Sequence, residues 1–230
     1  MASMIFSSYR FIFLFLPIVL AGYVLLKKAQ NVTLLKLWLI IASLYFYAQG
    51  NVKNLPLFIG TAVFNYLIGV FIIKCKQSKR NWAAGVLIVF GLIENIGLLV
   101  YFKYTNFFIQ NINRVAGTDF TLLKIILPLG ISFFTFQLIT YIVDCYKGNT
   151  KIYSMIDYLV FITFFPHLIM GPIVHHSELI EQVEKEETYV FNARNIMLGM
   201  FIFSVGCAKK VLLADPLIAF AQAFYSHTEP

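Results

Sequence analysis

Apolar runs that approach the length of a membrane-spanning helix alternate with short polar segments along the chain. A helix of roughly 20 mostly apolar residues crosses the hydrocarbon core of a bilayer. Runs of this kind lie at residues 9–26, 34–48, 55–73, 82–102, 125–143, 158–174 and 196–213. The pattern predicts an all-α, polytopic transmembrane helical protein with about seven spans.

Two further helices are expected outside these runs. Residues 104–117 carry phenylalanines and asparagines at helical spacing, which favours a short amphipathic helix near the membrane interface. Another short helix is expected after Pro216, because Asp215 suits an N-cap and proline suits the first helical position. The first run resembles a signal peptide, but Lys27 and Lys28 follow it directly and six more runs come after, which favours an uncleaved helix.

Residues 127–173 combine membrane-depth apolar sequence with proline, glycine and polar side chains. The sequence reads LPLGISFFTFQLITYIVDCYKG at 127–148 and DYLVFITFFPHLIMGPI at 157–173. Broken helices and buried polar groups are costly in a bilayer unless something satisfies them. The stretch therefore predicts a membrane cavity. Pro166, Gly171 and Pro172 are expected to turn the sixth run back as a re-entrant segment.

Composition agrees with a bilayer environment. Hydrophobic residues make up 60% of the chain, charged residues 13%, and the mean hydropathy is +0.78, too apolar for a soluble domain of this size. The net charge of +7 comes from basic residues scattered between apolar runs, so no nucleic-acid-binding face is expected. These residues concentrate in the first, third and fifth loops, which predicts cytoplasmic odd loops and an external N-terminus. The three cysteines lie far apart and indicate neither a disulfide framework nor a metal site.

A polar stripe is expected on the helix of the fifth run. Gln137, Tyr141 and Asp144 are spaced by four and three residues, which places them on one face. Such a stripe either lines a wet cavity or pairs with another helix, and the sequence leaves both interpretations open. Asp144 also precedes Lys147 by three residues, so an interfacial ion pair is a further alternative.

Polar residues also interrupt the third and fourth runs. Glu94 and Asn95 stand between Gly91 and Gly97, which allow close approach of another helix. An ionisable residue at membrane depth is a candidate functional group. A glutamate that holds two helices together explains Glu94 equally simply, and Asn65 needs only one interhelical hydrogen bond.

The four histidines give weak signals for catalysis or metal binding. His167 lies beside the predicted helix break, so it is expected to line a cavity or to have a structural role. His175 and His176 are adjacent and would point about 100° apart on a helix, whereas a two-histidine metal site favours a spacing of four. No metal site is therefore expected. His227 lies near the end of the sequence.

Two charged segments each have two interpretations. Lys209 and Lys210, near the end of the seventh run, either reach lipid phosphates or contact an anionic donor such as the phosphates of coenzyme A. The glutamate-rich residues 175–194 form either a solvated connector or a docking surface for a basic partner.

Eight sequence blocks carry a family resemblance. They are MIFSSYRFIFLFLPIVL, SLYFYAQG, NYLIGVFI, YFKYTNFF, PLGISFFTFQ, VDCYKG, FFPHLIMGPI and KKVLLAD. In this order the blocks resemble the membrane-bound O-acyltransferase (MBOAT) family. Within it they are most similar to the branch that contains the membrane subunit of alginate O-acetylation and related peptidoglycan O-acetylation proteins. The resemblance covers essentially all 230 residues.

The resemblance implies a partial MBOAT fold, with residues 1–230 as the N-terminal part of one membrane domain that includes re-entrant and interfacial helices. It implies transfer of an acetyl group from a cytoplasmic donor, acetyl-CoA or another acyl donor, across the lipid bilayer toward a cell-surface polysaccharide. A periplasmic acetyltransferase partner and a location in the bacterial inner membrane follow from the same resemblance. No bound cofactor is expected.

The histidine regarded as catalytic in the family is expected C-terminal to Pro230, beyond an aromatic-rich DFSGY-type motif. None of the four histidines here matches it, so the catalytic role is transferred to none of them. The residues expected to line the acyl-transfer tunnel are Gln137, Tyr141, Asp144, His167 and Glu94. Lys209 and Lys210 are expected on the donor side. A transporter subunit, which inverted repeats would favour, and a non-catalytic membrane scaffold are the alternatives.

Overall fold

The computed structural model describes residues 4–27, 31–169, 171, 175–185 and 192–226. All regular structure in these residues is helical, which confirms the all-α prediction. The α-helices are α1 (Leu16–Lys27), α2 (Val32–Asn51), α3 (Leu55–Gln77), α4 (Asn81–Leu99), α5 (Thr105–Ala116), α6 (Ile131–Lys147), α7 (Met155–Thr163), α8 (Phe165–Leu168), α9 (His176–Glu184), α10 (Ala193–Ala208) and α11 (Asp215–Ser226). The connecting helical turns are π-helical at Phe11–Phe15, Val100–Tyr104 and Lys209–Ala214, and 3-10 at Val52–Asn54.

Three continuous helical segments are long and apolar enough to cross a membrane, judged by length and composition. They are Val32–Gln77, Asn81–Ala116 and Ala193–Ala223, and a shorter apolar helix covers Phe11–Leu26. These helices make the chain a multi-pass membrane protein. The fifth and sixth predicted runs become shorter helices: the fifth forms the 17-residue α6, and the sixth is divided between α7 and α8.

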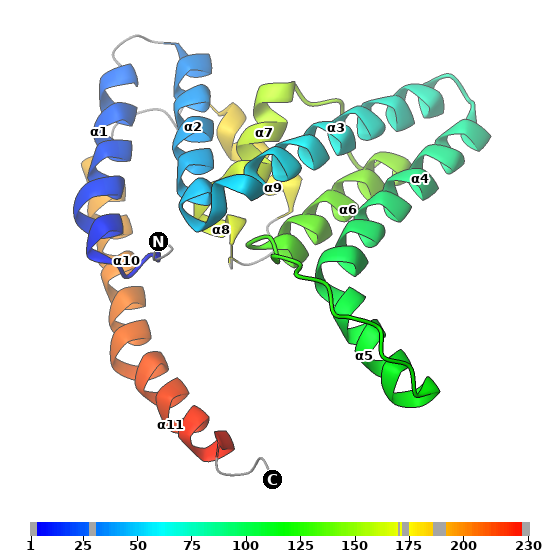
Figure 1. Ribbon diagram of the computed structural model, residues 1–230. Helices are drawn as coiled ribbons and strands as arrows, with labels where there is room; N and C mark the ends of the chain where they lie inside the picture. Colours follow the sequence, from blue (N-terminus) through cyan, green and yellow to red (C-terminus); the bar gives the residue numbers. More distant parts are fainter. Residues whose placement is uncertain (1–3, 28–30, 170, 172–174, 186–191, 227–230) are drawn as a thin grey trace.

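The helices pack in two groups joined through the middle of the chain. Figure 1 shows α1 beside α2 at one end and α3, α4 and α6 together at the other, with α7, α8 and α9 between the groups. The contacts among α3, α4 and α6 are the most extensive, and α2 packs on both α1 and α7. Helices α5 and α11 extend away from this body, whereas α10 runs beside α1 (Figure 1), with the ring centroids of Phe203 and Phe11 6.1 Å apart. No residue of α5 or α10 is buried.

Two apolar clusters lie where these helices meet. The larger one unites α3, α4, α6 and α7 around side chains that include Phe58, Leu138 and Tyr158, all fully buried. The smaller one is mainly aromatic and joins the N-terminal helix and α2 to α8, with the rings of Phe15 and Phe165 edge to face at a centroid distance of 5.3 Å. Close packing of this kind holds helices together where lipid supplies no hydrophobic driving force.

Amide side chains join α3 to α4 at membrane depth. Asn95 Nδ2 donates to Asn65 Oδ1 at 2.6 Å, and Asn65 Nδ2 donates to Glu94 Oε2 at 3.2 Å. Each asparagine also donates to the carbonyl four residues earlier in its own helix, and both are buried. Because hydrocarbon offers no alternative partners, these bonds satisfy groups that would otherwise be costly. The structure thus places Glu94 in the helix-joining arrangement that was one of its two sequence interpretations.

Two helices that were predicted as separate are continuous with the spans before them. α5 continues from α4 through the π-helical turn Val100–Tyr104, and α11 continues from α10 through Lys209–Ala214. The prediction of a separate helix capped by Asp215 is therefore wrong: Asp215 has helical backbone angles, and its carboxylate pairs with Lys210 at 2.8 Å. Pro216 lacks the N–H that a regular α-helix uses, and the π-helical turn changes the hydrogen-bonding register just before it.

The fifth predicted run starts its helix later than expected. Residues 118–128 are not helical, and α6 begins only at Ile131, after Pro128 and Gly130. Gly130 has a φ of +70°, outside the helical region, so α6 can begin only after it. A Cβ at this position would lie 2.9 Å from the carbonyl oxygen of Leu168. Glycine is required here by both the backbone conformation and the close approach of α8.

Two asparagines of α5 hold the extended segment that leads to α6. Asn106 donates to the carbonyl of Leu123 at 2.8 Å and accepts from its N–H at 3.0 Å. Asn113 makes the same pair of bonds with Phe120, at 2.9 and 3.0 Å. Each side-chain amide thus gives the backbone of the extended segment one hydrogen-bond donor and one acceptor, as a neighbouring strand would. This pairing accounts for the asparagines that recur along the amphipathic helix.

Replacement of Asn95 by alanine is expected to destabilise the protein by about 1 kcal/mol, because Asn65 Oδ1 loses its donor in a buried site. Thermal unfolding in detergent measures the effect. Asn111→Ala is the matched control, since Asn111 is exposed and donates only to a carbonyl of its own helix. Equal Tm values for the two variants would contradict a stabilising role of the α3–α4 clamp, the hydrogen-bonded group of Asn65, Glu94 and Asn95.

Gly130→Ala is expected to lower Tm more than Gly117→Ala does. Both glycines have a positive φ, of +70° and +64°, so the backbone strain of an added Cβ is similar. Only Gly130 faces a backbone oxygen within 3 Å, whereas nothing lies within 4 Å of a Cβ at Gly117. Parallel unfolding curves isolate the contact with α8, and a larger loss in the Gly117 variant would count against it.

Candidate functional site

The polar face of α6 lies against the interrupted segment that contains α7, α8 and α9. Gln137, Tyr141 and Asp144 have exposed fractions of only 3%, 0% and 7%. His167 of α8 and His176 of α9 are also buried, and their rings contact this face. Of the two interpretations of the stripe, the structure shows pairing with other parts of the chain, although not every polar atom finds a partner.

The end of α7 at Thr163 allows the following turn, α8, to place His167 against α6. α7 ends at Thr163, and Phe164 leaves the helical region with φ −52° and ψ 107°. The N–H of Phe165, which would otherwise be an unsatisfied helix-terminal donor, donates to Ser43 Oγ of α2 at 3.2 Å. The predicted interruption near Pro166 is thus confirmed, two residues earlier in the chain. Residues 172–174 lie outside the described residues, so the re-entrant turn stays a prediction.

Gln137 and His167 form a buried pair between α6 and α8. The Gln137 side-chain amide and His167 Nδ1 are 3.1 Å apart. Gln137 Oε1 and His167 Nε2 are buried without a hydrogen-bond partner among the described residues. When the amide donates to Nδ1, the neutral ring carries its proton on Nε2, which leaves one acceptor, Gln137 Oε1, and one donor, His167 Nε2, without a partner. Buried polar atoms are normally satisfied, so this pair is suited to a polar ligand.

Tyr141 connects the same face to α3 and α7. Its ring lies 4.8 Å from that of Tyr158 and 5.9 Å, edge to face, from the ring of His176. A Cβ at Gly69 would lie 2.8 Å from the Tyr141 hydroxyl, so glycine at that position makes room for the tyrosine. Tyr141 is therefore a packing centre beside the polar groups.

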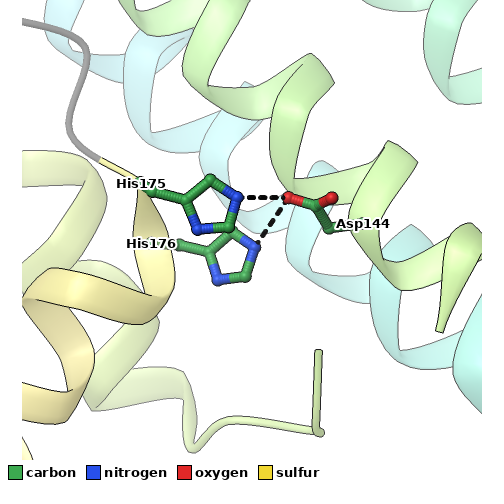
Figure 2. A group of neighbouring side chains, drawn as sticks. All are labelled: Asp144, His175 and His176. Carbon is green, nitrogen blue, oxygen red and sulfur yellow. Dashed lines mark hydrogen bonds and ion pairs between the residues drawn. The ribbon is translucent and has the colours of Figure 1, made fainter. Parts of the chain in front are cut away.

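Asp144 meets both histidines that begin α9. Figure 2 shows the two rings side by side, each aimed at one carboxylate oxygen: Oδ2 lies 2.9 Å from His175 Nε2 and 3.0 Å from His176 Nε2. The expectation that these rings diverge is wrong, because His175 precedes the helix with extended backbone angles of φ −71° and ψ 137°. The alternative ion pair of Asp144 with Lys147 is not formed in the described part of the chain.

Further hydrogen bonds orient the two rings. His176 Nδ1 lies 3.1 Å from the Tyr153 hydroxyl, and His175 Nδ1 lies 2.8 Å from Ser177 Oγ. Burial lowers the pKa of His176 below its ordinary value, although its hydrogen bond to Asp144 acts in the opposite direction. A histidine with a lowered pKa is neutral near pH 7 and can act as a ligand or acceptor.

The remaining candidates lie elsewhere. Glu94 belongs to the α3–α4 clamp. Lys209 is exposed, and Lys210, paired with Asp215, borders a cavity of about 410 Å³ whose lining includes Phe165 and Phe203. The structure therefore unites Gln137, Tyr141, Asp144 and His167 along α6 and keeps the two lysines on the long C-terminal helix.

Sequence reasoning missed His176 as part of this group. It is 1% exposed, although it begins a segment rich in glutamate that was expected to be a solvated connector. Its position two residues after the sequence GPIV, at the predicted helix break, was the available signal. The sequence alone does not indicate that a residue 32 positions beyond Asp144 returns to it.

Comparisons with known proteins agree with this architecture. A family model described as MBOAT, membrane-bound O-acyltransferase family, matches residues 29–229. A peptidoglycan O-acetyltransferase of Helicobacter pylori is 43% identical over 95% of this chain and 46% of its own length. A probable alginate O-acetylase AlgI of Pseudomonas aeruginosa is 38% identical over 99% of this chain and 43% of its own length.

A probable alginate O-acetylase AlgI of Azotobacter vinelandii is 36% identical over 99% of this chain and 45% of its own length. The chain thus spans less than half the length of these curated relatives. No solved structure matches it. The family match over most of the residues and the identities of the relatives together show that the chain belongs to the membrane-bound O-acyltransferase family.

Proposed function

We propose that this chain forms part of a membrane O-acetyltransferase that moves an acetyl group from a cytoplasmic donor toward a cell-surface polysaccharide. Family membership across residues 29–229 is the observation that carries the proposal. The names of the relatives support acetyl as the acyl group and alginate or peptidoglycan as the acceptor class. The donor is acetyl-CoA or another acyl donor, and the location is the bacterial inner membrane.

The reaction defines what this chain has to supply. Transfer from a thioester breaks the bond between the acyl carbon and sulfur and forms an ester bond to an acceptor hydroxyl. A base takes the hydroxyl proton, and the departing thiolate is protonated. We assign the base to none of His167, His175, His176 and His227. The role of this chain is to form the wall along which the acyl group and its acceptor meet.

The buried pair of Gln137 and His167 is the best-supported part of that wall. Its atoms without protein partners, Gln137 Oε1 and His167 Nε2, lie where a broken helix packs on α6. Non-helical backbone at membrane depth is tolerated where it is buried in protein or lines a polar cavity, and the two unpartnered atoms favour the cavity. A carbonyl or hydroxyl of a substrate could bond to one or both atoms. Tyr141 and Asp144 extend the same face of α6.

Lys209 and Lys210 are the basic residues of the donor side in this proposal. Lys210 borders an apolar cavity. A donor that carries phosphates and an acyl group would suit this place, because the cation can bind the phosphates while the acyl group lies in the apolar space. The ion pair of Lys210 with Asp215 would have to open for an anion, whereas exposed Lys209 is available directly. A periplasmic acetyltransferase partner would then complete delivery to the polysaccharide.

Deletion of the gene from its host is expected to remove most O-acetyl esters from one cell-surface polysaccharide. Mild alkaline release of acetate, followed by mass spectrometry of alginate, peptidoglycan and other exopolysaccharides, identifies the acceptor. Complementation with the wild-type gene should restore the esters. Unchanged ester content in every polysaccharide would refute the proposed function and leave a scaffold or transporter subunit.

Complementation with Gln137→Leu is expected to restore acetylation about tenfold more slowly than the wild type, which corresponds to the loss of about one hydrogen bond to a passing group. Gln110→Leu is the matched control, since Gln110 is exposed on α5. Amounts of membrane-inserted protein and Tm are compared so that a folding defect is recognised. A normal acetylation rate in the Gln137 variant would show that this side chain does not contact the acyl group or its acceptor.

A further inference from the structure

Three potential metal-ligand atoms converge at the junction of α6 and α9. Asp144 Oδ2, His175 Nε2 and His176 Nε2 lie within 4.8 Å of one another, and both nitrogen-to-oxygen distances are close to 3 Å, at 2.9 and 3.0 Å. Ligand atoms that each lie about 2.0–2.2 Å from one tetrahedral zinc ion are separated by roughly 3.3–3.6 Å. A small shift of the side chains would therefore let one ion bind all three.

The surroundings of the imidazole rings suit metal ligation. Histidine ligands usually bond through one nitrogen while the other donates to an oxygen that fixes the ring. Here the Nδ1 atoms lie at hydrogen-bond distance from hydroxyl oxygens of Tyr153 and Ser177. Hydroxyl groups accept as readily as they donate, so they fit rings whose Nε2 atoms hold a metal and whose Nδ1 atoms carry the proton.

The cluster is buried on one side and open on the other. The side chains of His176 and Asp144 are 1% and 10% exposed, which protects two ligands from competition with water. The side chain of His175 is 43% exposed, so one ligand is accessible from the protein surface without opening the fold. Three protein ligands leave a tetrahedral ion one position for water.

We propose that Asp144, His175 and His176 bind one divalent transition-metal ion such as Zn²⁺, which ties the start of α9 to the end of α6. Two imidazoles and a carboxylate match the ligand preferences of zinc. Metal binding is tested without reference to acetyl transfer, although Asp144 also belongs to the polar face of α6. In the competing arrangement, each Nε2 carries a proton and hydrogen-bonds to the carboxylate, and no ion is held.

Zinc binding to the detergent-purified protein tests this proposal. An affinity tag without histidine avoids added ligands. The wild type is expected to retain about one equivalent of zinc after dialysis, measured by mass spectrometry of the metal. His175→Gln is expected to weaken zinc binding at least about tenfold. His167→Gln is the matched control, because it removes a buried imidazole from outside the cluster and should retain the wild-type stoichiometry.

Thermal unfolding adds a readout that does not depend on variant yield. Zinc should raise the Tm of the wild type, and a chelator should reverse the increase, because a ligand that binds only the folded state stabilises it. His175→Gln, an exposed substitution that leaves the core intact, should lose this response. The proposal is overturned if the wild type binds no zinc, or if His175→Gln and Asp144→Asn bind zinc as tightly as the wild type.

Discussion

The need to satisfy buried polar groups on α6 determines the arrangement of the middle of this protein. Gln137 and Asp144 lie on the buried face of α6, with exposed fractions of 3% and 7%, so their polar groups need partners inside the protein. Their partners come from the chain that follows, which must stop being helical at Phe164 to bring His167 and then His176 back to α6. Satisfaction of backbone and side-chain groups thus explains the short helices that a simple spanning bundle would not contain.

The apolar periodicity was sufficient to predict the helices but not all of their ends. A proline was expected to begin a helix at Pro216, yet a π-helical turn carries the chain through it, and such turns have no simple sequence signature. The late start of α6 follows from Gly130, where a close approach by α8 adds to the backbone requirement. The convergence of His175 and His176 depends on where α9 begins, and a shift of one residue in a helix boundary reverses that prediction.

The sequence predicted only part of the candidate site, because spacing along one helix says nothing of which other segment packs on it. Helical spacing placed Gln137, Tyr141 and Asp144 on one face, and the structure shows that face buried. Spacing does not reveal which distant segment covers it, so the pairing of Gln137 with His167 and of Asp144 with His176 required the three-dimensional arrangement. The path for polar groups proposed above places this interrupted segment at its border, because Gln137 Oε1 and His167 Nε2 are buried there without a partner among the described residues.

The central claim is that Gln137 borders a water-accessible path and is not only part of a dry helix contact. Cysteine at this position, in a protein whose Cys75, Cys145 and Cys207 are replaced by serine or alanine, can be tested with a small, membrane-impermeant thiol reagent. A cysteine at the neighbouring, fully buried Leu138 provides the comparison. We expect rapid modification of the cysteine at position 137 and little modification at position 138, because only position 137 would border the path. Equal resistance at both positions would contradict the central claim.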